Sequence, residues 1–127
     1  MKSKVLVISI VLVLMFGLTA CGAVSSLKSV NTTGDAFMQA LKDQDNSTSW
    51  ALLTQAVQDE IGGESALADF TQPRNFDSWK FSSTNIENNT AQLDGEAKIS
   101  GDTYTVTLIM DPDGENWKIS GINFTLK

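Results

Sequence analysis

The sequence predicts an α+β domain in which three N-terminal helices pack on a curled, four-stranded antiparallel sheet. Apolar residues recur at helical spacing between about residues 33 and 70, and they alternate with polar residues from Trp79 onward. The alternation changes parity twice, which indicates two β-bulges and a strongly curved sheet. A curved antiparallel sheet needs a cover for its concave face, and the three amphipathic helices supply it.

The first helix is expected to begin near Thr33, and the second to be capped by Ser47 or Thr48 and to end at Gly62. A short third helix runs from Glu64 to Phe70, and residues 71–78 form a connecting loop because Pro73 prevents continuation. The residues on the inward stripes of these helices are expected to be Phe37, Ala40, Leu41, Trp50, Leu53, Val57, Ile61, Leu67 and Phe70.

The sheet is predicted to begin at Trp79, with a bulge between Ser83 and Asn85. The odd-numbered residues from 91 to 99 are small or apolar and share one face. A two-residue hairpin about Gly101-Asp102 then pairs Ile99 with Tyr104, Ala97 with Val106 and Leu93 with Met110.

A second hairpin is predicted at the turn sequence over residues 111–114. It pairs Met110 with Trp117 and Leu108 with Ile119, and a one-residue bulge at Ser120-Gly121 restores the inward face for the last strand. Beyond that bulge the expected pairs are Val106 with Ile122 and Tyr104 with Phe124.

Residues 1–20 have the composition of an export signal. Basic residues precede an uncharged apolar run from Val5 to Leu18, and small residues lead to Cys21, the only cysteine. The sequence Leu-Thr-Ala-Cys at residues 18–21 resembles the lipobox of bacterial lipoproteins. That resemblance implies cleavage between Ala20 and Cys21, and a diacylglycerol on the Cys21 thiol.

We therefore expect a signal peptide over residues 1–20, a lipidated Cys21 with a flexible tether over residues 21–32, and a single domain over residues 33–127. The protein would be held by acyl chains on the extracytoplasmic side of a cell membrane or outer membrane. An uncleaved anchor is the alternative, although 14 apolar residues span only about 21 Å as a helix, against a hydrocarbon core of ~30 Å.

Composition excludes several classes of function. Without residues 1–20 the chain carries 7 basic and 15 acidic residues, a net charge of −8. Such a domain is poorly suited to nucleic acid, because phosphates require a basic surface. The chain has no histidine, which excludes Cys/His zinc sites and histidine-based nucleophilic triads. The carboxylates near residues 111–116 lack the spacing of a calcium loop, so we predict no metal site and no cofactor.

The chain resembles cystatin-like and nuclear-transport-factor-2-like domains. Residues 35–45 and 50–53 resemble the opening helices of that superfamily, and residues 113–122, with Trp117 and Ile119 before a glycine bulge, resemble its closing strand. The likeness covers about residues 30–127 and is closest to small exported lipoproteins of unassigned function. It implies a pocket between helices and sheet, and dimerisation through the sheet.

The predicted function is non-catalytic binding of a small apolar ligand or an envelope protein partner. A small pocket enzyme of the isomerase or hydratase kind is the alternative, and it would need a carboxylate base beside Tyr104, the only tyrosine. The candidate bases Asp35, Asp69 and Asp77 are not forced inward by the pattern. The expected pocket residues are Phe37, Trp50, Leu67, Phe70, Tyr104 and Trp117, with Phe76 and Trp79 as candidates for its mouth.

The outward-facing residues of the sheet are an alternative contact surface for a partner or a second copy. This face is predicted to be polar and flat. Its residues are Gln92, Asp94, Glu96, Lys98, Thr103, Thr105 and Thr107.

Overall fold

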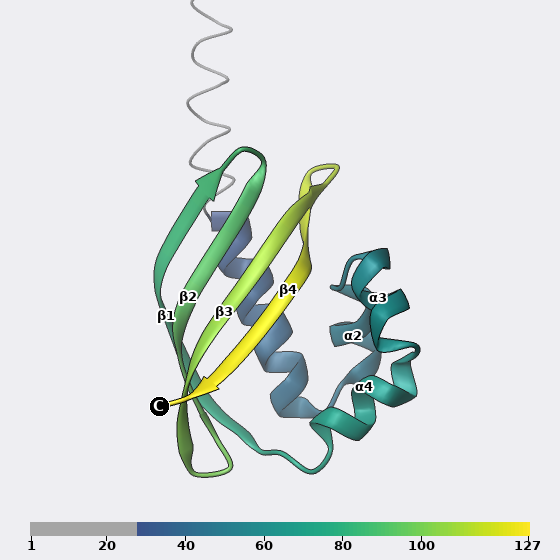
Figure 1. The fold of residues 1–127 in the computed structure, drawn as a ribbon, viewed down its shortest axis with the longest axis vertical. Helices are drawn as coiled ribbons and strands as arrows, with labels where there is room; N and C mark the ends of the chain where they lie inside the picture. The colour runs from purple at the N-terminus through teal and green to yellow at the C-terminus, as the bar shows by residue number, and fades with distance from the viewer. Residues whose placement is uncertain (1–27) are drawn as a thin grey trace, which may run out of the picture.

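The computed structural model describes residues 28–127, so the predictions for residues 1–20, Ala20 and Cys21 lie outside the described residues. Helices pack on one face of a four-stranded antiparallel sheet of order β1-β2-β3-β4 (Figure 1). The α+β fold predicted from the sequence is confirmed. Within residues 28–127, no helix is both long enough and apolar enough to cross a membrane.

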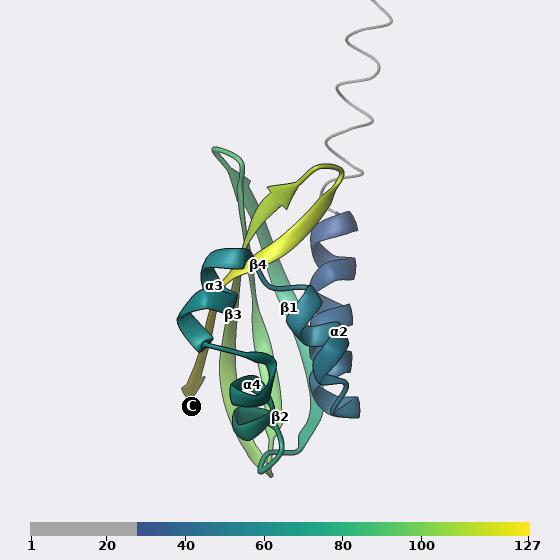
Figure 2. The same cartoon turned by 90° about the vertical axis from the view of Figure 1, so that its right-hand side faces the viewer.

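The first helix begins earlier than predicted. Its described part covers residues 28–43, so residues 28–32 are helical and do not belong to a flexible tether. The reason is burial: Val30 is fully buried in the core cluster together with Phe37, Met38 and Leu41. These positions share one stripe of a 3.6-residue helix. Figures 1 and 2 show this helix lying along one face of the sheet.

The predicted second helix is two helices in the structure, α2 (Asn46–Ala51) and α3 (Gln55–Ile61). Between them Leu53 is fully buried and forms a parallel β-bridge with Ile119 of β4. Thr54 then starts a new helix, because its side chain accepts a hydrogen bond from the backbone N–H of Val57. The cap of α2 is Asp45 and not Ser47 or Thr48.

Helix α4 (Glu64–Thr71) matches the predicted third helix to within one residue. The helical segment before it ends at Gly62, which has a left-handed φ of 96°, as predicted. Leu67 and Thr71 are the buried residues of α4. The Thr71 hydroxyl donates to Asn46 Oδ1 over 3.1 Å, which joins α4 to α2.

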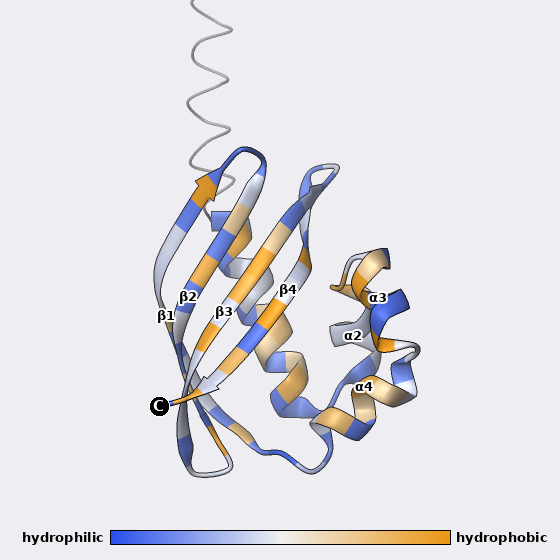
Figure 3. Ribbon diagram, in the orientation of Figure 1, coloured by the Kyte–Doolittle hydropathy of each residue, from blue (hydrophilic) through white to orange (hydrophobic). Residues whose placement is uncertain are grey.

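The strands are β1 (Phe76–Glu87), β2 (Thr90–Ile99), β3 (Asp102–Asp113) and β4 (Asn116–Leu126). Apolar and polar residues alternate along β2, β3 and β4 (Figure 3), and the odd-numbered residues of β2 are buried as predicted. Strand β1 begins at Phe76 and not at Trp79. Phe76 is 2 % exposed, so part of the expected loop over residues 71–78 belongs to the sheet and core.

The register of the first predicted hairpin is wrong by two residues. Ala97 pairs with Tyr104 and Leu93 with Leu108. The turn residues are Ser100 and Gly101, both at positive φ (51° and 89°). A two-residue turn of this kind favours glycine in its second position, not its first. Because the error is two residues, every side chain remains on its predicted face.

The hairpin of β3 and β4 has the same two-residue error. Met110 pairs with Ile119, and Leu108 pairs with Ile122. The loop residues are Gly114 and Glu115, and Gly114 has the positive φ of 63° that the first position of a type II′ turn requires. The shift between Ile109 and Met110 leaves Ser120 unpaired, so the predicted bulge is confirmed.

The bulge in β1 lies close to its predicted position. The pairing of β1 with β2 shifts between Phe81 and Ser83, so Ser82 is the extra residue, one position before the predicted range. A second shift, between Phe76 and Ser78, was not predicted.

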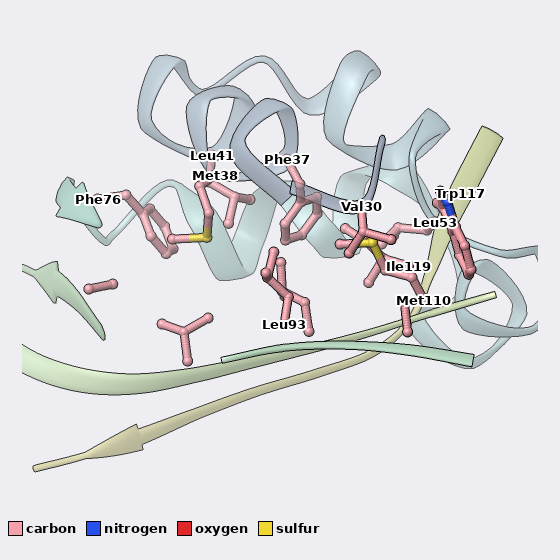
Figure 4. Packing of buried hydrophobic residues seen from close by; sticks show 14 of the residues in the cluster. Val30, Phe37, Met38, Leu41, Leu53, Phe76, Leu93, Met110, Trp117 and Ile119 are labelled. Atoms are coloured by element: carbon pink, nitrogen blue, oxygen red, sulfur yellow. The ribbon is translucent and has the colours of Figure 1, made fainter. Parts of the chain in front are cut away.

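The core runs the length of the sheet, beneath the first helix (Figure 4). Phe76 lies at one end of the drawn cluster, and Leu53 and Trp117 lie at the other. Between them the side chains of Phe37 and Val30 point toward the strands. This arrangement makes the two ends of the domain different, and the end at Phe76 holds the candidate site.

Candidate functional site

A cavity of about 510 Å³ opens between the helices and the inner face of the sheet. The first helix, the end of α3, and α4 form one wall. All four strands contribute to the other wall, β2 through Ile99 alone. The lining residues are Phe37, Leu41, Ile61, Ala66, Leu67, Phe70, Arg74, Phe76, Ile99, Tyr104, Ile122 and Phe124.

Four of the six expected pocket residues line this cavity: Phe37, Leu67, Phe70 and Tyr104. Trp50 and Trp117 do not. Trp117 pairs with Pro112 close to the turn between β3 and β4, at the far end of the core, and it is 8 % exposed. Trp50 is half-buried on α2, where it packs against the core cluster. The expectation that both tryptophans share the pocket is therefore wrong.

Of the two residues expected at the mouth of the cavity, one lines the cavity and the other does not. Phe76 lines the cavity, and its ring lies 6.0 Å from that of Phe124 at an angle of 56°. Trp79 lies outside the lining. Its indole Nε1 donates to Asp35 Oδ1 over 3.1 Å, which joins β1 to the first helix.

Arg74 is a lining residue that the sequence pattern did not identify. It lies in the segment between α4 and β1, and it is the only arginine of the chain. Its guanidinium lies 4.3 Å from the centroid of the Phe70 ring, and its Nη1 donates to the Phe70 carbonyl oxygen. Neither of the two ion pairs among residues 28–127 includes Arg74.

The lining is apolar except for the charge of Arg74 and the hydroxyl of Tyr104. Burial is graded along it: Phe37 and Leu67 are buried, whereas Phe70 is 42 % exposed and Arg74 is exposed. The charged group therefore lies on the open side of a cavity whose inner wall is apolar.

None of the carboxylates considered as catalytic bases lines the cavity. Asp35, Asp69 and Asp77 are all exposed. Within the part of the chain that the structure describes, no group of three or more acidic or sulfur ligands could hold a metal ion. The cavity residues therefore provide apolar contact, one cation and one phenol.

The outer face of the sheet is polar, as the alternation predicted. Gln92, Glu96, Lys98 and Thr105 are exposed. Asp94 accepts hydrogen bonds from the Thr107 hydroxyl over 2.7 Å and from Gln92 Nε2 over 2.9 Å. Dimerisation through this face stays a prediction.

The cavity lies at the end of the domain away from residue 28. Lys28 and Ser29 border a surface hollow together with Asn116, close to the turn between β3 and β4. The cavity residues Ile99 and Tyr104 instead flank the turn between β2 and β3. From residue 28 to Leu41 the first helix advances about 20 Å, at ~1.5 Å per residue.

Comparison with known proteins supports the fold. No family model matches the sequence, and no curated protein matches it. Among solved structures, a candidate dehydratase of the NTF2-like family from Streptomyces avermitilis superposes with a TM-score of 0.62 at 14% identity, covering 83% of this chain and 98% of that one.

Two further structures have no assigned activity in their names. A DUF4783 family protein from Bacteroides uniformis has a TM-score of 0.56 at 10% identity and covers 73% of this chain and 95% of its own. A protein of unknown function with a cystatin-like fold from Nostoc punctiforme has a TM-score of 0.57 at 10% identity, with coverages of 78% and 89%. The domain therefore has the cystatin-like or NTF2-like fold, and these likenesses extend to the fold alone.

Proposed function

We propose that this protein is a membrane-anchored lipoprotein of the cell envelope whose domain binds a small ligand with an apolar body, without catalysis. The observation that supports binding is the cavity, whose 510 Å³ falls within the ~300–1,000 Å³ range of small-molecule sites. Its walls come from the first helix, α4 and the sheet, which share one core. Such a cavity is already formed, so a ligand gains apolar burial without ordering its walls.

The lining argues for binding over isomerase or hydratase chemistry. Those reactions need a group that accepts and returns a proton at the ligand, and a carboxylate in an apolar pocket is the kind of base the fold would use. Asp35, Asp69 and Asp77 are exposed and lie outside the lining. The candidate dehydratase among the structural neighbours shares the fold at 14% identity, which carries no activity to this chain.

Binding is tested by filling the cavity. Ala66 lies in the lining on α4 and is exposed, so Ala66→Trp introduces a large side chain there without disturbing the core. Ala56→Trp is the matched control, because Ala56 is an exposed position of α3 outside the lining. We expect Ala66→Trp to remove labelling of the lining peptides by a tail-diazirine alkyl probe, and Ala56→Trp to leave it unchanged.

That experiment uses the full chain isolated from bacterial membranes and held in lipid nanodiscs, with labelled peptides identified by mass spectrometry. Label on peptides outside the lining measures partition into lipid and is subtracted. Equal labelling of the lining in both variants would contradict binding in this cavity. Consumption of a panel of hydroxy-acyl or enone substrates by the wild type would instead favour the enzyme alternative.

The anchoring part of the proposal rests on the resemblance of residues 18–21 to a lipobox, and it is tested separately. We expect the intact mass of the wild type to show loss of residues 1–20 and addition of acyl chains, with the protein in the membrane fraction. Cys21→Ser should abolish the acyl mass. An unmodified chain that still fractionates with membranes would show a plain anchor, and a wild type found in the cytosol would contradict the proposal.

A further inference from the structure

We propose that the cavity selects single-chain amphiphiles with a carboxylate head, which Arg74 binds at the mouth while the chain occupies the apolar interior. The inference rests on the proposed binding function and names the chemical class of its ligand. It is carried by one juxtaposition: the only arginine of an acidic protein lies on the rim of an otherwise uncharged cavity.

Within residues 28–127, no carboxylate forms an ion pair with Arg74. Lys118 pairs with Asp113 and Lys127 pairs with Glu96, and these are the ion pairs described among residues 28–127. Arg74 instead has the Phe70 ring 4.3 Å from its guanidinium carbon, and one hydrogen bond to the Phe70 carbonyl. A guanidinium carries five N–H donors in a planar fork, so most of its donor capacity is left for a ligand.

Phe70 holds the Arg74 guanidinium through two separate contacts. The ring of Phe70 supports the face of the guanidinium, and the Phe70 carbonyl oxygen accepts from Nη1. A guanidinium held in this way loses little conformational freedom when it binds a ligand, and its fork matches the two oxygens of a carboxylate. A lysine could not reproduce this geometry, because an ammonium is a point charge without a planar fork.

The gradient of burial sets the orientation of the ligand. The inner wall is built from buried residues such as Phe37 and Leu67, where an alkyl chain would lose contact with water. The outer rim holds the exposed Arg74 and the half-exposed Phe70, where a charged head keeps part of its hydration. With the head at the rim and the tail inside, the charged head stays hydrated and the alkyl chain is buried. The reverse orientation would bury an unpaired charge.

The test is a double-mutant cycle between protein and ligand. The probes are a tail-diazirine alkyl carboxylate and the alcohol of the same chain length, measured with the nanodisc-held full chain by labelling of the lining peptides. The variants are the wild type and Arg74→Gln. Lys98→Gln is the control, because it removes one positive charge from the exposed outer face of the sheet, outside the cavity lining.

We expect the wild type to bind the carboxylate about tenfold more tightly than the alcohol, the size of one charge-assisted contact at a partly solvated site. Arg74→Gln should reduce that preference to near onefold, while Lys98→Gln keeps the preference. Arg74→Lys should retain only part of it.

The outcomes separate this inference from the proposed function. If both probes label the lining equally in the wild type, the carboxylate assignment is overturned while the binding function stands. An alkyl phosphate of the same chain length is the third probe. If it binds more tightly than the carboxylate with the same dependence on Arg74, the head group is a phosphate and the assignment is likewise overturned. If neither probe labels the lining and Ala66→Trp changes nothing, the binding function itself fails.

Discussion

Gly95 of β2 lies so close to the backbone of Lys80 in β1 that no side chain fits between them. A Cβ built on Gly95 would lie 2.1 Å from the Lys80 carbonyl oxygen and 2.7 Å from the Cα of Phe81. Phe81 is the direct pairing partner of Gly95, and the register shift at Ser82 follows at once. The close approach of the two backbones at this bulge therefore requires glycine.

Gly95→Ala should destabilise the domain by about 1–3 kcal/mol or more, because the atoms that the new methyl would meet belong to the backbone and cannot rotate away. Urea unfolding followed by tryptophan fluorescence measures the change. Lys98→Ala, an exposed position of the same strand, should stay within about 0.5 kcal/mol of the wild type. A Gly95→Ala protein as stable as the Lys98→Ala control would show that the strands can separate at no cost.

The contact between Thr71 and Asn46 should contribute to stability across helices. Thr71 is fully buried at the end of α4, and its hydroxyl lies 3.1 Å from Asn46 Oδ1 at the start of α2. A cycle of Thr71→Val, Asn46→Ala and the double variant should give a coupling of about 1 kcal/mol, typical of one hydrogen bond. Strictly additive single effects would mean that the bond to the Ala68 carbonyl, at 3.3 Å, satisfies Thr71 instead.

Asp45 should make stability depend on pH in the acid range. The hydroxyl of Thr48, and then its backbone N–H, donate to the Asp45 carboxylate and hold its pKa below the ordinary value of 3.8. Because the folded-state pKa is the lower one, the stabilisation is present above about pH 4 and is lost as pH falls through the folded-state value.

Asp45→Asn separates this charge effect from the cap itself, since asparagine also caps helices well. The wild type should exceed Asp45→Asn slightly in urea midpoint at pH 7, and the difference should shrink at acid pH, as the Asp45 carboxyl becomes protonated in the folded state as well. Asp45→Ala should lower the midpoint at both pH values. A difference between wild type and Asp45→Asn that grows on acidification would reverse the sign and refute the assignment.

Sequence periodicity predicted which face each strand residue occupies, but it did not determine the register. Ala97 and Leu93 were assigned to the inner face correctly, although each was paired two residues too far along β3. Alternation has a period of two, so it is blind to a shift of two. The register depends on the turn, where Ser100 adopts a positive φ that serine rarely takes, and the pattern gave no sign of it.

The candidate site was predicted in its aromatic wall and missed at its rim. Phe37 and Phe70 follow helical spacing, which periodicity detects. Arg74 lies after Pro73, in a segment without period, and its place depends on where α4 ends and β1 begins. Trp117 was correctly assigned to the inner face of the sheet. Its position along the sheet depends on the strand register, however, and the predicted register of β3 and β4 was two residues in error.

Phe70→Leu tests whether the ring beneath Arg74 sets the preference for a charged head. Leucine keeps the lining apolar and removes the aromatic face that lies 4.3 Å from the guanidinium. Because Phe70 is 42 % exposed, the free energy of unfolding should change by no more than about 1 kcal/mol, the size of an exposed cation–π contact.

The preference of the cavity for an alkyl carboxylate over the matched alcohol should fall several-fold in Phe70→Leu, since an unsupported guanidinium loses more freedom on binding. Phe70→Tyr keeps the ring and should keep the preference, so it controls for substitution at this position. Labelling of the lining peptides by the two probes measures both. A Phe70→Leu protein with the full wild-type preference would show that the Phe70 carbonyl alone positions Arg74.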